Sequence, residues 1–324
     1  MYLNAFAQGL RRLRPLVAVT ALLAVLAFAA REAPAAAGSG PSLLSVVQER
    51  GYVRCGVHRS GVGLAEIRAD GVWAGYFIEF CRVVALAAVG DGQAIRVFEV
   101  DDSSAALALR ERLVDVVLST IRRDHVADAE HSIAYLSPIL EDEQMLVSFQ
   151  PGIGGVDSLP PLARICASRH PTVQANLREA LRARARSVEI IDYQSIDGLF
   201  NAFFRQRCDA VTHHHYAILA QSLLRSPQRS PVWRSEFSLG QLAFVPSVCD
   251  DDAEWMALVE AATQTALHVP GFDAQAIPSA VASGFAERIH AISNSATAIY
   301  ARTLGQMGGQ GFYAAPPSLL QHGS

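Results

Sequence analysis

From residue 43 onward, short strand-like runs alternate with longer helical runs, and this alternation restricts the possible folds more than any other feature. After a helix expected at 42–50, the first series comprises strand 52–57, helix 78–89, strand 94–100, helix 103–112 and strand 114–119. Such alternation is typical of a mainly parallel sheet with helices on both faces. The sequence therefore predicts an α/β fold.

A Gly- and Pro-rich stretch, Gln150 to Gly155, interrupts the pattern, and a second alternating series then begins. That series comprises strands 163–167, 188–193 and 209–212, helices 172–183, 196–207 and 217–224, a return strand at 239–246, and helices at 251–268 and 286–304. We expect two lobes: lobe 1 from residues 43–146 plus 243–324, and lobe 2 from residues 149–240. The chain would cross between them twice, near Val147 and Gln241, and two crossovers form a hinge over a closing cleft.

The position of a ligand site follows from the expected sheet. In open α/β sheets, ligands bind beyond the carboxyl ends of the strands. Four segments would therefore surround the cleft: Arg54–Gly63, Ser119–Arg123, Ser168–Thr172 and Thr212–His215.

The first 37 residues have the layout of a cleaved secretion signal. Arg11, Arg12 and Arg14 precede an apolar run from Leu16 to Ala30, and small residues follow at 35–37. The alternative is a retained membrane anchor, but a run of about 15 residues is shorter than the roughly 20 that a spanning helix needs. We therefore expect an exported, periplasmic protein.

Composition supports a globular chain of two ordinary domains. Apolar residues make up 51% of the 324 residues and charged residues 18%. The formal net charge of −4 gives no indication of a nucleic-acid partner, which would need a basic face.

All five cysteines follow the signal segment, and in an oxidising compartment they are candidates for disulfides. Cys55 ends an expected strand and Cys81 lies in the helix that should pack beside it, while Cys166 and Cys208 lie in or beside strands of a later βαβ segment. We predict Cys55–Cys81 and Cys166–Cys208, with Cys249 unpaired. The alternative is five reduced thiols. No C-x-x-C is present, so neither a redox motif nor a zinc knuckle is supported.

Several segments, in order along the chain, resemble the periplasmic solute-binding proteins of polar amino-acid ABC transporters (family 3), above all the general L-amino-acid-binding clade. The matching segments are CGVHRSGVGLAEIRADGVWAGYFIEFCRVVA (55–85), LVDVVLST (113–120), ICASRHPTVQANL (165–177), RCDAVT (207–212) and GGQGFYAAPP (308–317). The resemblance implies a two-lobe, type II periplasmic-binding-protein fold with two hinge crossovers. It also implies capture of a small solute, delivery to a membrane permease and no catalysis. We expect no cofactor.

The chain departs from this family at the positions that usually bind the charged groups of the ligand. The family's carboxylate-clamping Arg and its assisting Thr fall on Ala127 and Asp124, and the ammonium-binding Asp falls on His214. Leu64 stands where an aromatic residue is usual. A buried charge without its partner costs about 3–5 kcal/mol. We therefore expect a small organic anion or an amino-acid derivative rather than an ordinary amino acid in its usual pose.

Candidate ligand contacts follow the expected strands. Arg122 and Arg123 directly follow the V-D-V strand and could replace the missing clamp, or could be a solvated loop pair. Ser119 and Thr120 offer hydroxyls at the end of that strand.

A second group lies before helix 172–183, where free backbone N–H groups favour an anion. Arg169, His170 and Thr172 belong to this loop and helix start, with simple N-capping as the alternative.

Three consecutive histidines, 213–215, follow the strand after R-C-D. Alternate side chains of a strand point to opposite faces, so His213 and His215 could share one face and His214 the other. A metal site needs three or four ligands in suitable geometry, and no Cys or carboxylate has a convincing spacing, so we expect no metal. His213 and His214 are candidate pocket residues, with a surface loop as the alternative. Trp73 is expected to pack its turn or to form a cleft wall.

The leading hypothesis is a periplasmic solute-binding protein that serves an ABC import permease. The alternative is a periplasmic accessory or sensory protein of the same fold with a degenerate cleft and no transport role. An enzyme would need a paired acid and base, and the candidates Asp124, His125 and His214 are scattered. We therefore expect no enzymatic activity.

Overall fold

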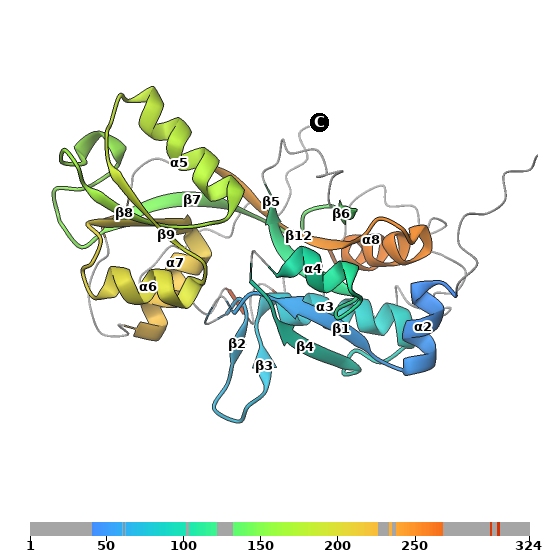
Figure 1. The fold of residues 1–324 in the computed structure, drawn as a ribbon. Helices are drawn as coiled ribbons and strands as arrows, with labels where there is room; N and C mark the ends of the chain where they lie inside the picture. The colour runs from blue at the N-terminus through green and yellow to red at the C-terminus, as the bar shows by residue number, and fades with distance from the viewer. Residues whose placement is uncertain are drawn as a thin grey trace, which may run out of the picture. The chain divides into compact units, whose positions relative to one another are not determined.

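The computed structural model describes residues 41–59, 61, 63–101, 104–121, 132–225, 233–234, 238–267, 299 and 303–304 (Figure 1). The predicted signal segment, the loop with Arg122 and Arg123 and most of the predicted helix 286–304 lie outside these residues. The described residues from Ser42 on belong to one compact unit. The lobe boundaries therefore stay a prediction.

The first series of elements agrees with the expected order and adds a short hairpin. It comprises α2 (Leu43–Arg50), β1 (Val53–Val57), β2 (Glu66–Ile67), β3 (Trp73–Ala74), α3 (Tyr76–Val89), β4 (Ile95–Glu99), α4 (Ala105–Arg110), β5 (Val116–Ile121) and β6 (Ile133–Tyr135). Local signals explain two boundaries: the Ser42 hydroxyl accepts from the Ser45 N–H at the start of α2, and Gly90, in the left-handed region, ends α3.

The second series begins after a long strand, β7 (Leu140–Ser148), which the sequence patterns did not predict. A 3-10 turn at Val156–Ser158 leads to β8 (Arg164–Ser168), α5 (Pro171–Ala183), β9 (Glu189–Tyr193), α6 (Ile196–Phe204), β10 (Ala210–His214), α7 (His215–Arg225), β11 (Trp233–Arg234), β12 (Gly240–Cys249) and α8 (Ala253–Leu267). The predicted start of the helix near Pro171 and Thr172 is confirmed, because α5 begins at Pro171.

The main sheet has two parallel halves. Its strand order is β4-β1-β5-β12-β7-β10-β8-β9, with β6 and β11 pairing off this path. Strands β4, β1 and β5 are parallel, and so are β10, β8 and β9. Between the halves, β12 and β7 pair antiparallel with each other and with the neighbouring half, so these two strands are the crossovers of the predicted two-lobe fold (Figure 1).

Helices cover the parallel halves and bury apolar cores. In the first half, α3 packs over β1 with α8 beside it, and Phe77, Phe80 and Trp255 are among the fully buried side chains. In the second half, Leu177 of α5 packs with Ile165, whereas Phe200 of α6 packs with Val211 in a separate core. Both predicted disulfides are present: Cys55–Cys81 joins β1 to α3, and Cys166–Cys208 joins β8 to the segment before β10. Cys249 is unpaired and buried.

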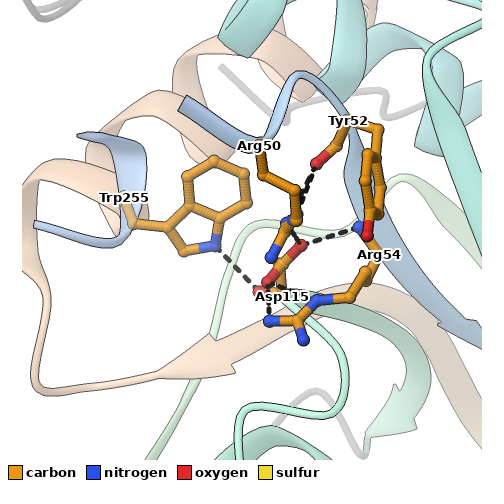
Figure 2. A network of polar contacts seen from close by, with 5 residues as sticks. All are labelled: Arg50, Tyr52, Arg54, Asp115 and Trp255. Carbon is orange, nitrogen blue, oxygen red and sulfur yellow. Dashed lines mark hydrogen bonds and ion pairs between the residues drawn. The ribbon is translucent and has the colours of Figure 1, made fainter. Parts of the chain in front are cut away.

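A buried acidic residue holds the start of the first half together (Figure 2). Asp115 accepts hydrogen bonds from the backbone N–H of Arg54 at 2.7 Å and from its guanidinium at 2.9 Å, and it forms an ion pair with Arg50. The indole N–H of Trp255 donates to the Asp115 carbonyl at 2.8 Å. Through this residue, β1, β5 and α8 are tied to one another at the end of the sheet away from the strands' carboxyl ends.

Candidate functional site

A cavity of about 230 Å³ lies beyond the carboxyl ends of parallel strands from both halves of the sheet. Its lining comes from four strand ends: His58 and Arg59 after β1, Glu99, Val100 and Asp101 at the end of β4, Ser168 at the end of β8, and, after β9, Gln194 and Ser195 with Ile196 and Asp197 at the start of α6. Two of the four segments expected around a ligand, those that follow β1 and β8, contribute to this lining. The ends of β4 and β9 were missed by sequence reasoning.

Local hydrogen bonds hold the polar rim of this cavity. The Ser195 hydroxyl caps α6 by accepting from the Gly198 N–H at 3.1 Å. The Asp101 carboxylate accepts from the Ser104 N–H at 2.9 Å at the start of α4. Asp197 forms an ion pair with Arg225 at 2.9 Å, which largely offsets its charge.

The charges of the lining are mixed. Glu99 and Asp101 contribute carboxylates and Arg59 a guanidinium, while Asp197 has Arg225 as its partner. The charged or titratable contacts predicted from the sequence were all Arg or His side chains, which favour an anion. The described lining instead offers acceptors for a cationic group as well as donors for an anionic one.

The predicted residues near α5 are adjacent to the cavity but do not line it. The Arg169 side chain is exposed, and its backbone N–H donates to the Tyr193 carbonyl at 2.9 Å. The His170 Nδ1 accepts from the Thr172 N–H at 3.3 Å, so His170 is the N-cap of α5, and Thr172 is buried. His170 thus caps α5 and Thr172 is packed, and the predicted part of all three residues in ligand binding stays a prediction.

Trp73 belongs to the short β3 strand and is half-buried against the core around α3, away from the cavity lining. Ser119 and Thr120 lie at the end of β5, where they pair with Val245 and Phe244 of β12. Arg122, Arg123 and the departing positions Asp124 and Ala127 lie outside the described residues. Their predicted part in ligand binding stays a prediction.

The three histidines are divided between a strand and a helix. His213 and His214 end β10 and are buried, so the surface-loop alternative is wrong for them, whereas His215 begins α7. The His214 ring stacks on Phe244 of β12 with centroids 4.3 Å apart. Within the described part of the chain, no group of three or more His, Cys, Asp or Glu side chains has an arrangement that would hold a metal ion.

Asp142, which sequence reasoning missed, lies fully buried on β7 beside these histidines. Its carboxylate accepts the backbone N–H groups of Glu143 at 2.7 Å and Tyr216 at 3.0 Å, and its Oδ2 lies 3.7 Å from Nδ1 of His214. Burial raises the pKa of Asp142 to about 8, although the two N–H donors oppose this. Burial also lowers the pKa of His214 well below its usual value, and His213, His170 and His58 lower it further. Three charged residues in sequence, Glu141 to Glu143, are the only signal that preceded this cluster.

The sequence matches no family model. It is 25% identical over 244 residues to the general L-amino acid-binding periplasmic protein AapJ of Rhizobium johnstonii, covering 74% of this chain and 70% of that protein. It is 24% identical over 254 residues to the putative amino-acid ABC transporter-binding protein YhdW of Escherichia coli K12, covering 75% and 70%. These two relatives support the resemblance seen in the sequence.

The fold also matches a solved structure, a periplasmic binding protein of an ABC transporter from Brucella ovis with glutathione bound. The TM-score is 0.71 at 20% identity, and the match covers 83% of this chain and 92% of that one. Within the described residues, no helix has the length and apolar character needed to cross a membrane. Sequence and fold agree: this chain is a homologue of the periplasmic solute-binding proteins of amino-acid ABC transporters and has their two-lobe α/β fold.

Proposed function

We propose that this protein captures a small amino-acid-like or anionic solute in the periplasm and delivers it to the permease of an ABC importer. The observation that carries the proposal is the cavity built from strand ends of both parallel halves, which are joined by the crossover strands β7 and β12. A solute held by both halves favours their closed arrangement, and a closed arrangement is a state that a permease can distinguish from the empty protein.

The mixed charges of the lining favour a solute that carries both a positive and a negative group. Glu99 and Asp101 can accept from an ammonium or guanidinium group, and Arg59 can donate to a carboxylate. Among relatives, AapJ is named for general L-amino acids, and the Brucella protein was solved with glutathione. Both support an amino acid or a derivative of one as the solute.

His214 explains why the binding pose would differ from the family's usual one. The resemblance places the ammonium-binding acid at this position, but the His214 side chain is 2% exposed and packs on Phe244. An ammonium group would therefore be bound by carboxylates of the lining, such as Glu99 and Asp101.

A thermal-shift screen of the purified protein tests this proposal. The panel contains L-glutamate, L-arginine, L-cysteine, glutathione, succinate and citrate. A solute at 100 times its dissociation constant should add about 2.7 kcal/mol to the free energy of unfolding. Arg59→Ala should weaken the response of the active compound, whereas Arg182→Ala, on the exposed face of α5, should leave it unchanged. A response to succinate or citrate alone would favour the purely anionic solute.

The second candidate is an accessory or sensory protein with a degenerate cleft. The buried position of His214 favours it, because the family's ammonium anchor is then absent from the cleft. In that case no compound of the panel should both raise the melting temperature and reduce the radius of gyration in small-angle scattering. A compound that does both would contradict this candidate and support solute capture.

A further inference from the structure

Asp142 and His214 lie where the two crossover strands meet the second half of the sheet. Asp142 belongs to β7 and pairs with Leu242 of β12, and two residues further along β7, Gln144 pairs with His214 of β10. The His214 ring in turn stacks on Phe244 of β12, and Phe244 lies 4.9 Å from the ring of Phe77 in α3, in the first half. The pair therefore lies against both crossover strands, with Asp142 on β7 and His214 stacked on β12.

Both side chains are withdrawn from solvent, at 5% exposure for Asp142 and 2% for His214. Each oxygen of Asp142 accepts one backbone N–H, and Nδ1 of His214, 3.7 Å from Oδ2, has no hydrogen-bond partner among the described residues. This nitrogen could accept a proton held on Oδ2 of Asp142, because a shift of less than about 1 Å would bring the two atoms to a normal hydrogen-bond distance.

The surrounding charges do not supply a cation that would keep Asp142 ionised. Among the described residues, no Lys or Arg forms an ion pair with Asp142. His215 of α7 has its Nδ1 4.0 Å from Oδ1, and Glu143 on β7 repels a negative charge. His213, the loop residue His170 before α5 and His58 after β1 act against a charged His214, while the neighbouring residues of β12 are Leu242 and Phe244.

We propose that a proton held between Asp142 and His214 makes the hinge sensitive to pH. While the proton is present, the pair is neutral and β7, β10 and β12 keep the arrangement described. When the proton leaves to bulk water, an unpaired carboxylate remains in the interior. A buried anion of this kind is costly, so the hinge shifts toward an arrangement in which water reaches Asp142.

Two titrations of the solute-free wild-type protein test this directly. Infrared difference spectroscopy should detect a protonated carboxyl group at about pH 6.5 that is lost as the pH passes about 8. Small-angle scattering over the same range should show a change in the radius of gyration with the same midpoint. The ratio of the two arrangements should change by up to about tenfold per pH unit.

Two variants separate this pair from other causes. Asp142→Asn has no titratable proton. With its NH2 group in place of Oδ2 it can donate to His214 while its oxygen accepts the Glu143 N–H, at the cost of the Tyr216 hydrogen bond, so its radius of gyration should not depend on pH. Glu143→Gln, at the adjacent exposed position, should keep both transitions. The proposal is overturned if the wild type shows no protonated carboxyl band, if its radius of gyration is constant, or if Asp142→Asn responds to pH as the wild type does. Because the infrared and scattering midpoints are measured on the wild type, a misfolded variant would not prevent the test.

Discussion

The Asp115 carboxylate accepts both the backbone N–H and the guanidinium of Arg54, and Asp209 binds Arg164 in the same way in the other half of the sheet. In each half the acid lies just before a strand, and its own N–H donates to the carbonyl of that arginine at 2.8 Å. The two halves therefore repeat one local motif that aligns neighbouring parallel strands. The repeats differ in burial: the Asp115 side chain is 0% exposed and the Asp209 side chain 23%.

This difference in burial predicts unequal losses of stability. Asp115→Ala leaves the Arg50 and Arg54 guanidinium groups without their buried partner and should cost about 3–5 kcal/mol. Asp209→Ala breaks a pair with a more exposed arginine and should cost about 1 kcal/mol. Urea denaturation of the two variants measures both values. Equal losses would contradict the role of burial.

The stability of the protein should decline as the pH rises from about 6.5 to about 8. In that range the folded state keeps the proton of Asp142, whose pKa is raised from 3.8 to about 8, and the unfolded state has lost it. The free energy of unfolding should therefore fall by about 1.4 kcal/mol per pH unit, or about 2 kcal/mol in total. Below pH 6.5, the lowered pKa of His214 opposes this trend, because the unfolded state then binds a proton that the folded state does not.

Calorimetry across this range measures the decline, and Asp142→Asn should remove it.

The loss of stability at low pH has another origin. Burial would raise the pKa of Asp209, but hydrogen bonds and charge from Arg164 outweigh it and lower that pKa below 3.8. Stability from Asp209 should therefore be lost as the pH falls below about 4, with or without Asp142. A flat profile between pH 6.5 and 8 in the wild type would refute the assignment to Asp142.

The disulfides should contribute substantially to stability. They close loops with sequence separations of 26 and 42 residues, and the chain-entropy model assigns about 3–4 kcal/mol to loops of this length. The double variants Cys55→Ser/Cys81→Ser and Cys166→Ser/Cys208→Ser should each lose about this amount in denaturant titrations.

A thiol titration provides the control for the pairing itself. The oxidised, denatured protein should have one reactive thiol, that of Cys249, and the reduced protein should have five. Five thiols before reduction would mean that neither disulfide forms.

Two glycines in the first half should respond differently to alanine. Gly75 precedes α3 with a φ of +120°, and a Cβ there would lie 2.4 Å from the carbonyl oxygen of Leu64. Gly71 has a φ of +80° but open space around its Cβ position. Gly71→Ala should cost about 1–2 kcal/mol from backbone strain alone. Gly75→Ala should cost more, because backbone atoms must also move. The melting temperatures of the two variants measure this difference.

The sequence by itself determined the order of most elements, the two parallel halves and both disulfides. These features depend on local patterns, such as the apolar run after Gly75, the Pro171 start of α5 and the regular spacing of strands and helices. Because such signals act within a few residues, they can be recognised in the sequence without the tertiary structure.

Only the tertiary structure decided the crossover strand β7 and the environment of the site. The charged residues Glu141, Asp142 and Glu143 do not resemble a buried strand in the sequence, so β7 was not predicted. In the folded protein the Tyr216 N–H, from far along the chain, donates a hydrogen bond to the buried Asp142 carboxylate. The burial of His214 likewise depends on Phe244 of β12. Such contacts join residues distant in sequence, and their free energies depend on burial and partners that local patterns do not contain.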